Sequence, residues 1–184
     1  MDFTSQEPVV IAVVTQCKEW LYIFENKLDL YSCIANDMYK EGIDIHGPIE
    51  EVRAKLTEKF PKLPKDPNNP KDVAKCAIRD DSKTCTLAIS YGQSAKEFSK
   101  RTGMHLDKVE RFYKLFDERY PEIKVFKNKV EALVNAGKTI ETMFGCKRSS
   151  FLTKVGDPKV DMSRKNRLYR QLINFLIQQV RFVS

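Results

Sequence analysis

The amino-acid sequence predicts a mainly α-helical fold with one small β-hairpin, an α+β class. Apolar residues recur at the spacing of one helix face through most of the 184 residues. Only residues 138–153 alternate in the way that is typical of paired strands. The longest apolar run, Val9–Val14, is far shorter than the ~20 residues that cross a bilayer, so we expect no membrane segment.

The first part of the chain is predicted to be one helix over residues 9–40. Pro8 suits a first helical turn, where its missing N–H is not needed, and apolar residues continue at helical spacing as far as Met38. Residues 41–75 differ, because seven glycines and prolines gather there. We expect this segment to be a loop with one short helix over residues 49–60.

Helices are expected again from residue 72 onwards. The first runs over residues 72–101, and Tyr91-Gly92 ends or bends it. Asp107 is the expected cap of the next helix, which Pro121 breaks.

The last third of the chain contains the predicted hairpin between two helices. A helix over residues 123–136 stops at Gly137. Residues 138–144 and 149–153 are then the expected strands, joined by a basic turn, and residues 164–183 form the final helix.

The cysteines and histidines favour neither a disulfide framework nor a zinc site. The five cysteines are widely spaced and include no C-x-x-C pair, so we expect reduced thiols. His46 and His105 are too few for a histidine-rich metal centre.

The formal charge of +7 lies entirely in the last 38 residues. Residues 147–184 hold nine lysines and arginines against two aspartates, whereas the charges of residues 1–146 balance. Such a basic stretch fits binding to a phosphate backbone. It is equally typical of a solvated basic helix without a ligand.

Three groups of residues could carry chemistry. At the N-terminus, Thr4 and Glu7 have capping-box spacing, but Asp2 and Glu7 could also serve as oxygen ligands of a cation such as Mg²⁺. Near the C-terminus, Arg170, Asn174 and Gln178 share one helical face and could contact a DNA minor groove. That face would otherwise be an ordinary polar surface.

The third group is a stripe at a spacing of four residues along the predicted helix over 72–101. Its members are Arg79, Lys83, Leu87 and Tyr91-Gly92. Two cations followed by an aromatic ring could hold a triphosphate and a base. The alternative is a solvated face, with Arg79 paired to the neighbouring aspartates.

Together and in this order, the three groups resemble family A DNA polymerases, the DNA polymerase I type, and phage members in particular. Asp2 to Pro8 is similar to motif A, and residues 29–35 are similar to the segment that follows it. Arg79 to Gly92 resembles motif B, the most specific part. The resemblance covers nearly the whole chain, with residues 41–75 as the main insertion.

The resemblance implies a role for each site residue. Asp2 would be the catalytic metal ligand, and Glu7 would exclude ribonucleotides. Tyr31, Arg79 and Lys83 would bind the incoming triphosphate, and Lys83 would also protonate the leaving pyrophosphate.

The remaining roles concern the sugar, the template and the duplex. Leu87 stands where the family usually has Phe or Tyr and influences discrimination at the sugar 3′ position. Tyr91 would stack near the templating base. The residues implied in binding DNA are Gly92, Arg170, Asn174 and Gln178.

The implied fold is the fingers and part of the palm of a polymerase right hand. Residues 1–40 would be partial palm and the start of the fingers, and residues 41–75 the insertion. Residues 76–137 would be the fingers helices, and residues 138–184 a basic return to the palm that contacts DNA.

One departure from the family affects the expected activity. Its last catalytic motif, His-Asp-Glu, is absent from the 184 residues. Transfer by two metal ions needs carboxylates that bridge both, and Asp2 supplies only part of that set. We therefore expect a split or truncated DNA polymerase that is inactive alone, with a Mg²⁺ site completed by a second polypeptide.

The expected substrates are dNTPs and primer–template DNA, in the cytoplasm of a bacterium or of a phage-infected host. One alternative is a non-catalytic DNA-binding remnant. Another is a fragment of a phage-type RNA polymerase, against which Glu7 argues because it would block the ribose.

Overall fold

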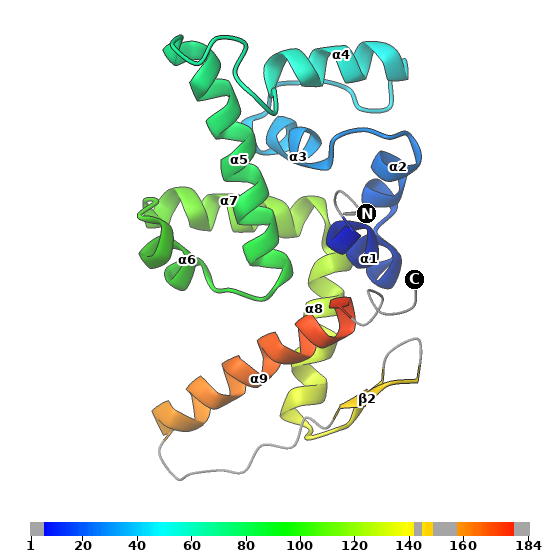
Figure 1. Cartoon of the computed structure of the whole chain (residues 1–184). Helices are drawn as coiled ribbons and strands as arrows, with labels where there is room; N and C mark the ends of the chain where they lie inside the picture. The colour runs from blue at the N-terminus through cyan, green and yellow to red at the C-terminus, as the bar shows by residue number, and fades with distance from the viewer. Residues whose placement is uncertain (1–5, 142–144, 149–157, 179–184) are drawn as a thin grey trace. The chain divides into compact units, whose positions relative to one another are not determined.

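A computed structural model describes residues 6–141, 145–148 and 158–178 (Figure 1). Asp2, the expected strand at 149–153 and the end of the last helix lie outside these ranges. The described chain is mostly helical with one small antiparallel sheet, which confirms the predicted fold class. The elements are α1 (Gln6–Thr15), α2 (Lys18–Glu25), α3 (Leu30–Tyr39), α4 (Ile49–Lys59), α5 (Pro70–Ser90), α6 (Ala95–Thr102), α7 (Leu106–Arg119), α8 (Pro121–Asn135), β1 (Ile140–Glu141), β2 (Lys147–Arg148) and α9 (Pro158–Gln178).

The chain divides into two compact units. The first unit consists of residues 1–17, 90–93 and 120–184, and so contains α1, α8, the hairpin and α9. The second unit consists of residues 18–89 and 94–119, and contains α2 to α7 apart from the last residue of α5. No helix of the described residues is long and apolar enough to cross a membrane.

The single helix expected over residues 9–40 is wrong, because three helices occupy this range. Gln16 and Lys27 have positive φ angles of 55° and 53°, a left-handed conformation that no helix can continue through. Asp29 then starts α3 as its N-cap, and its side chain accepts a hydrogen bond from the backbone N–H of Ser32. Apolar spacing predicted helical structure in this range but not the breaks between the three helices.

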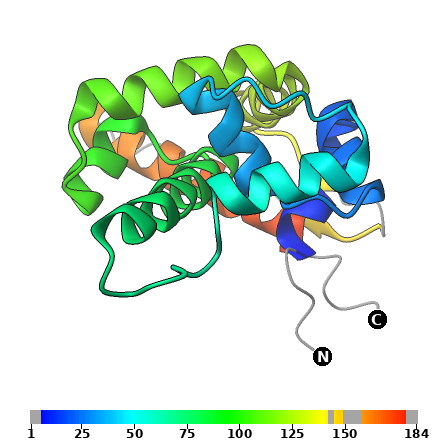
Figure 2. The same ribbon diagram turned by 90° about the horizontal axis from the view of Figure 1, so that it is seen from above.

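Within the expected insertion, the short helix is confirmed as α4. Its apolar side buries Val52 and Leu56, and Phe60 follows it with an exposed fraction of 1%. Figures 1 and 2 show α3 between α4 and α7, inside the second unit. Almost all of α3 is buried as a result, including Tyr31.

The helix expected over residues 72–101 is divided in two. It ends at Ser90, where the φ of Gly92 is +72°, so the predicted stop at Tyr91-Gly92 is confirmed and the continuation is wrong. A new helix, α6, begins because Ser94 and Glu97 form a capping box.

The next two helices begin earlier than predicted. The cap predicted at Asp107 is wrong, because α7 already starts at Leu106 and Asp107 lies in its first turn, where a carboxylate still favours the helix N-terminus. Pro121 ends that helix as predicted and is itself the first residue of α8.

The first unit contains the hairpin and the last helix. Ile140 pairs with Arg148 and Glu141 with Lys147 in antiparallel register. Residues 147 and 148 were expected in the turn, so that detail is wrong. The last helix, α9, starts at Pro158, six residues before the expected Arg164, because proline suits a first helical turn.

Candidate functional site

Two helices of the second unit bring Tyr31, Arg79 and Lys83 together. Tyr31 lies in the first turn of α3, and the two cations lie one turn apart on α5. The guanidinium carbon of Arg79 is 5.5 Å from the centroid of the Tyr31 ring, and Lys83 Nζ is 5.8 Å from it. Residues about 50 positions apart in the sequence therefore form one cationic cluster around an aromatic ring.

The guanidinium of Arg79 is held by Asp29, the N-cap of α3. Arg79 Nε donates to Asp29 Oδ2 and Nη2 donates to Oδ1, both at 2.8 Å. This is the bidentate geometry that makes arginine–carboxylate pairs strong and directional. The side chain of Arg79 is only 9% exposed and that of Asp29 is 26% exposed, so the pair is largely shielded from solvent.

The pairing changes the pKa values of both groups. Burial raises the pKa of Asp29, but hydrogen bonds from Arg79 and Ser32 and the charge of Arg79 outweigh it, and the resulting pKa is about 2. Burial of Arg79 lowers its pKa, but the bond to Asp29 more than compensates and the net shift is upward. Both groups are therefore charged at neutral pH.

The alternative for the stripe on α5, in which Arg79 pairs with the neighbouring aspartates, is only partly correct. Arg79 Nη1 is 3.7 Å from the exposed Asp80, a much looser contact than the one with Asp29. Asp81 instead pairs with Lys108 on α7, at 3.0 Å. Lys83 is exposed, so its ammonium group is open to an anionic ligand.

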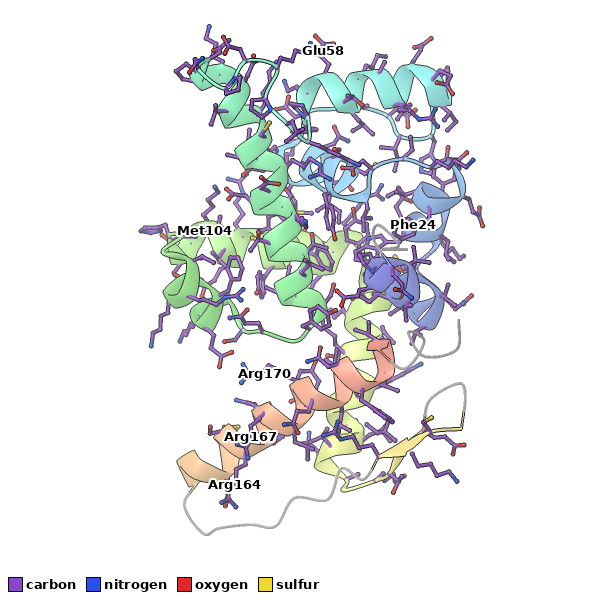
Figure 3. The ribbon with its side chains drawn as sticks, viewed as in Figure 1. Phe24, Glu58, Met104, Arg164, Arg167 and Arg170 are labelled. Atoms are coloured by element: carbon purple, nitrogen blue, oxygen red, sulfur yellow. The ribbon has the colours of Figure 1, made fainter. Side chains whose placement is uncertain are left out.

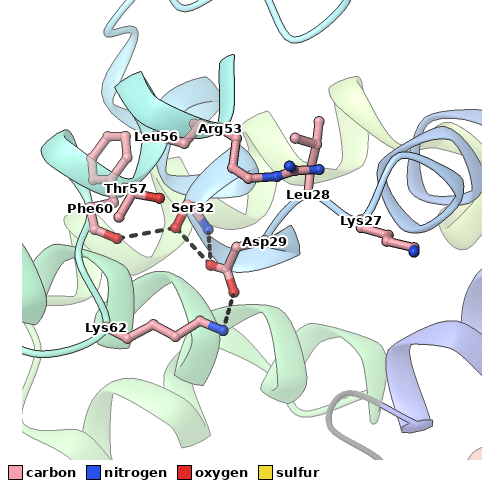
Figure 4. A pocket seen from close by; sticks show the side chains of 9 residues that line it. All are labelled: Lys27, Leu28, Asp29, Ser32, Arg53, Leu56, Thr57, Phe60 and Lys62. Atoms are coloured by element: carbon pink, nitrogen blue, oxygen red, sulfur yellow. Dashed lines mark hydrogen bonds and ion pairs between the residues drawn. The ribbon is translucent and has the colours of Figure 1, made fainter. Parts of the chain in front are cut away.

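A pocket of about 310 Å³ has Asp29 in its lining (Figure 4). Leu28, Leu56 and Phe60 give it an apolar lining. Its remaining lining residues are polar or charged: Lys27, Asp29, Ser32, Arg53, Thr57 and Lys62. Lys62 Nζ is 3.6 Å from Asp29 Oδ1, so the expected insertion reaches the same carboxylate that holds Arg79.

Leu87 and Tyr91 continue the stripe in sequence but belong to different units. Leu87 is half-buried near the end of α5, in the second unit. Tyr91 and Gly92 follow the helix and belong to the first unit. Gly92 lies against α9, where a Cβ atom would be 2.6 Å from a ring carbon of Tyr169 and 3.2 Å from Ile173 Cδ1.

Gly92→Ala is expected to lower the free energy of unfolding by about 2–4 kcal/mol, because it adds a clash with Tyr169 to the cost of a left-handed backbone. Urea denaturation measures the change. Gly103→Ala is the matched control, since Gly103 has a φ of +74° with nothing within 4 Å of a Cβ. Equal losses in the two variants would show that the approach of α9 does not require glycine.

The polar face expected on the last helix lies on α9. Arg170 and Asn174 are partly exposed one turn apart, and Gln178 is the final residue of the helix. Figure 3 shows that Arg164, Arg167 and Arg170 follow one another along α9, and they extend this face toward its start. Leu172, Ile173 and Ile177 of the same helix are buried, so α9 also contributes apolar side chains to the first unit.

The proposed metal ligand, Asp2, lies outside the described residues. Glu7 is partly exposed in the first turn of α1, five positions beyond it in the sequence. Among the described residues, no three histidine, cysteine or acidic side chains are grouped closely enough to hold a metal ion. A carboxylate at Asp2 has the oxygen chemistry that Mg²⁺ requires.

Sequence reasoning placed Asp29 in a motif but gave it no function. The ion pair joins positions 29 and 79, and nothing in the local sequence of either predicts the other. The N-cap was a recoverable signal, because an aspartate directly before an apolar run is typical of a helix start. Arg53 and Lys62 in the pocket carried no signal of this kind.

Comparisons with known proteins were made for both sequence and structure. The family model described as DNA polymerase family A matches residues 66–180, which include Arg79, Lys83 and α9. No curated protein sequence matches the chain. The fold is similar to the POL domain of Pol1 from M. smegmatis, solved in complex with DNA primer–template and dNTP. The TM-score is 0.66 at 16% identity, and the match covers 96% of this chain but only 26% of the other.

Proposed function

The chain belongs to DNA polymerase family A, and we propose that it supplies a triphosphate-binding surface and a duplex-binding helix for template-directed DNA synthesis. The observation that carries the proposal is the cluster of Tyr31, Arg79 and Lys83 on α3 and α5. It presents two cations beside a ring, a combination suited to the charge of a nucleoside triphosphate.

In the proposed reaction the primer 3′-oxygen attacks the α-phosphorus of a dNTP and pyrophosphate leaves. The task of the protein is chiefly to position the phosphates and neutralise their charge. Lys83 would bind them with its exposed ammonium group and give a proton to the leaving pyrophosphate. Arg79 would bind them from an anchored position, with the Tyr31 ring beside it.

Mg²⁺, when bound, would neutralise charge on the reacting phosphates, and Asp2 is the residue of this chain that would hold it. The 184 residues lack the His-Asp-Glu motif, so further carboxylates would come from polypeptide outside them. We propose a second polypeptide as their source.

Sugar and base selection follow from three other residues. Glu7 would crowd a ribose 2′-hydroxyl, which selects deoxynucleotides. Leu87 would influence discrimination at the 3′ position, and Tyr91 would stack near the templating base. The phage-like motifs are consistent with synthesis in the cytoplasm of a bacterium or of a phage-infected host.

The primer–template duplex would lie along α9. Arg170, Asn174 and Gln178 can donate to minor-groove acceptors, which differ little between base pairs. Gly92, whose missing side chain makes room for Tyr169 of α9, would meet the strand through its backbone. Arg164 and Arg167 add positive charge for the phosphates. Binding should therefore weaken steeply with salt and depend little on sequence.

Primer extension tests the proposal, with the chain alone and with a candidate polypeptide that carries the His-Asp-Glu segment. The pair should incorporate the dNTP that matches the template and reject the corresponding rNTP, whereas the chain alone should not. Salt-dependent DNA binding without incorporation in any mixture would instead identify a DNA-binding remnant. Equal use of dNTP and rNTP would contradict the role of Glu7.

A further inference from the structure

We propose that Asp29 is a positioning residue that fixes the guanidinium of Arg79 in the orientation that receives the triphosphate. The inference rests on the proposed function and extends it to a residue with no assigned role. Asp29 itself would not touch the substrate, because it acts from behind the arginine.

The geometry of the pair leaves Arg79 able to bind a second anion. Two of its five N–H groups, one on Nε and one on Nη2, are used by Asp29. Asp29 does not use the two hydrogens of Nη1 or the second hydrogen of Nη2. Nη1 makes one loose contact, 3.7 Å from Asp80 Oδ1. These three N–H groups are the ones with which Arg79 would bind a phosphate while Asp29 stays in place, and the two parallel bonds to Asp29 fix the plane of the guanidinium.

The carboxylate of Asp29 is itself held in place. Asp29 Oδ2 accepts hydrogen bonds from the backbone N–H of Ser32 at 3.0 Å and from its hydroxyl at 2.7 Å. Because Asp29 is the N-cap of α3, its position is fixed by the first turn of that helix. The same turn carries Tyr31, over whose ring Arg79 lies.

Residues 41–75, the predicted insertion, add two contacts to this support. Ser32 Oγ is also within 3.2 Å of the carbonyl oxygen of Phe60, the buried residue that follows α4. Lys62 Nζ lies 3.6 Å from Asp29 Oδ1 (Figure 4). The side chain of Lys62 is 66% exposed, so its contribution is small. Ser32 donates its hydroxyl hydrogen to Asp29 over the shorter distance, and its contact with the buried Phe60 carbonyl fixes where the hydroxyl lies.

Asp29 should have opposite effects on binding and on rate. Its negative charge offsets part of the positive charge of Arg79 and so weakens the attraction for a triphosphate. Its hydrogen bonds hold the guanidinium still, which favours the reacting geometry. Loss of the charge should therefore strengthen dNTP binding, while loss of the orientation slows incorporation.

Asp29→Asn separates these effects, because asparagine is also a good N-cap and still accepts a bond from Ser32. Asp80→Asn is the matched control, since it removes the same charge beside Arg79 from a side chain that is 65% exposed. Two measurements are made on each variant. One is the ¹⁵N NMR signal of Arg79 Nε in the ligand-free chain. The other is single-turnover dNTP incorporation by the complemented polymerase.

In the wild type and in Asp80→Asn, the Arg79 Nε–H should give a resolved signal that exchanges slowly with water. In Asp29→Asn the signal should broaden or exchange at least 10-fold faster. The maximal rate of incorporation should also fall at least 10-fold in Asp29→Asn, with a dNTP dissociation constant equal to that of the wild type or lower.

Three results would overturn the positioning role. The first is an unchanged Arg79 signal in Asp29→Asn, and the second is an unchanged rate despite a changed signal. The third is a parallel loss of affinity and rate, because it would indicate general damage. Absence of incorporation by the wild-type pair would contradict the proposed function itself and is thus distinguishable from each of these.

Discussion

Lys83→Ala is expected to weaken dNTP binding about 30-fold, because it removes one charge-assisted contact to the triphosphate, worth about 2 kcal/mol. Lys83 is exposed on α5, with its ammonium nitrogen 5.8 Å from the centroid of the Tyr31 ring. Truncation of Lys83 is not expected to remove a hydrogen bond from any described residue, so the fold should be unaffected. Equilibrium dialysis with a labelled dNTP and Mg²⁺ measures the change.

Lys71→Ala is the matched control, since Lys71 is an exposed lysine of the same helix two turns before Arg79. It should bind dNTP as the wild type does. Lys83→Arg should recover part of the affinity, because the charge is retained. Equal dissociation constants for Lys83→Ala, Lys71→Ala and the wild type would exclude Lys83 from the triphosphate site.

Arg79→Met is expected to lower the free energy of unfolding by about 3 kcal/mol at pH 7. The substitution keeps an apolar side chain of similar size but leaves the half-buried carboxylate of Asp29 without its main partner. Urea denaturation measures the loss. Lys83→Met is the control, because it makes a comparable change at an exposed position of the same helix and should cost little.

The loss in Arg79→Met should also depend on pH, with a sign set by Asp29. The pKa of this carboxyl is about 2 in the folded chain, below the ordinary value of 3.8, so the pairing stabilises the fold above about pH 4. That contribution disappears as pH falls through the folded pKa. The difference between wild type and Arg79→Met should therefore shrink by more than half between pH 5 and pH 2.5. A constant difference would mean that the ion pair does not stabilise the fold.

The helical class of the fold could be predicted from apolar spacing alone. The breaks at Gln16 and Lys27 could not, because each depends on one residue that adopts a positive φ without being glycine. The break after Gly92 was partly predictable, since Ser94 and Glu97 carry capping-box spacing that would have located the start of α6.

The residues of the candidate site were likewise only partly predictable from the sequence. Arg79 and Lys83 share one helix, so their spacing revealed the pair. Tyr31 joined them only through a resemblance that covers both segments. The pairing of Asp29 with Arg79 depends on how α3 packs beside α5. The local sequence around either residue does not predict that contact.

The central claim is that α5 and the start of α3 form the surface that holds the triphosphate. Photo-crosslinking with a dNTP that carries an aryl azide on its γ-phosphate, followed by mass spectrometry, tests it most directly. The label should fall on residues 79–87 or near Tyr31, and excess unmodified dNTP should suppress it. Label scattered over exposed lysines elsewhere, or unaffected by competing dNTP, would contradict the account.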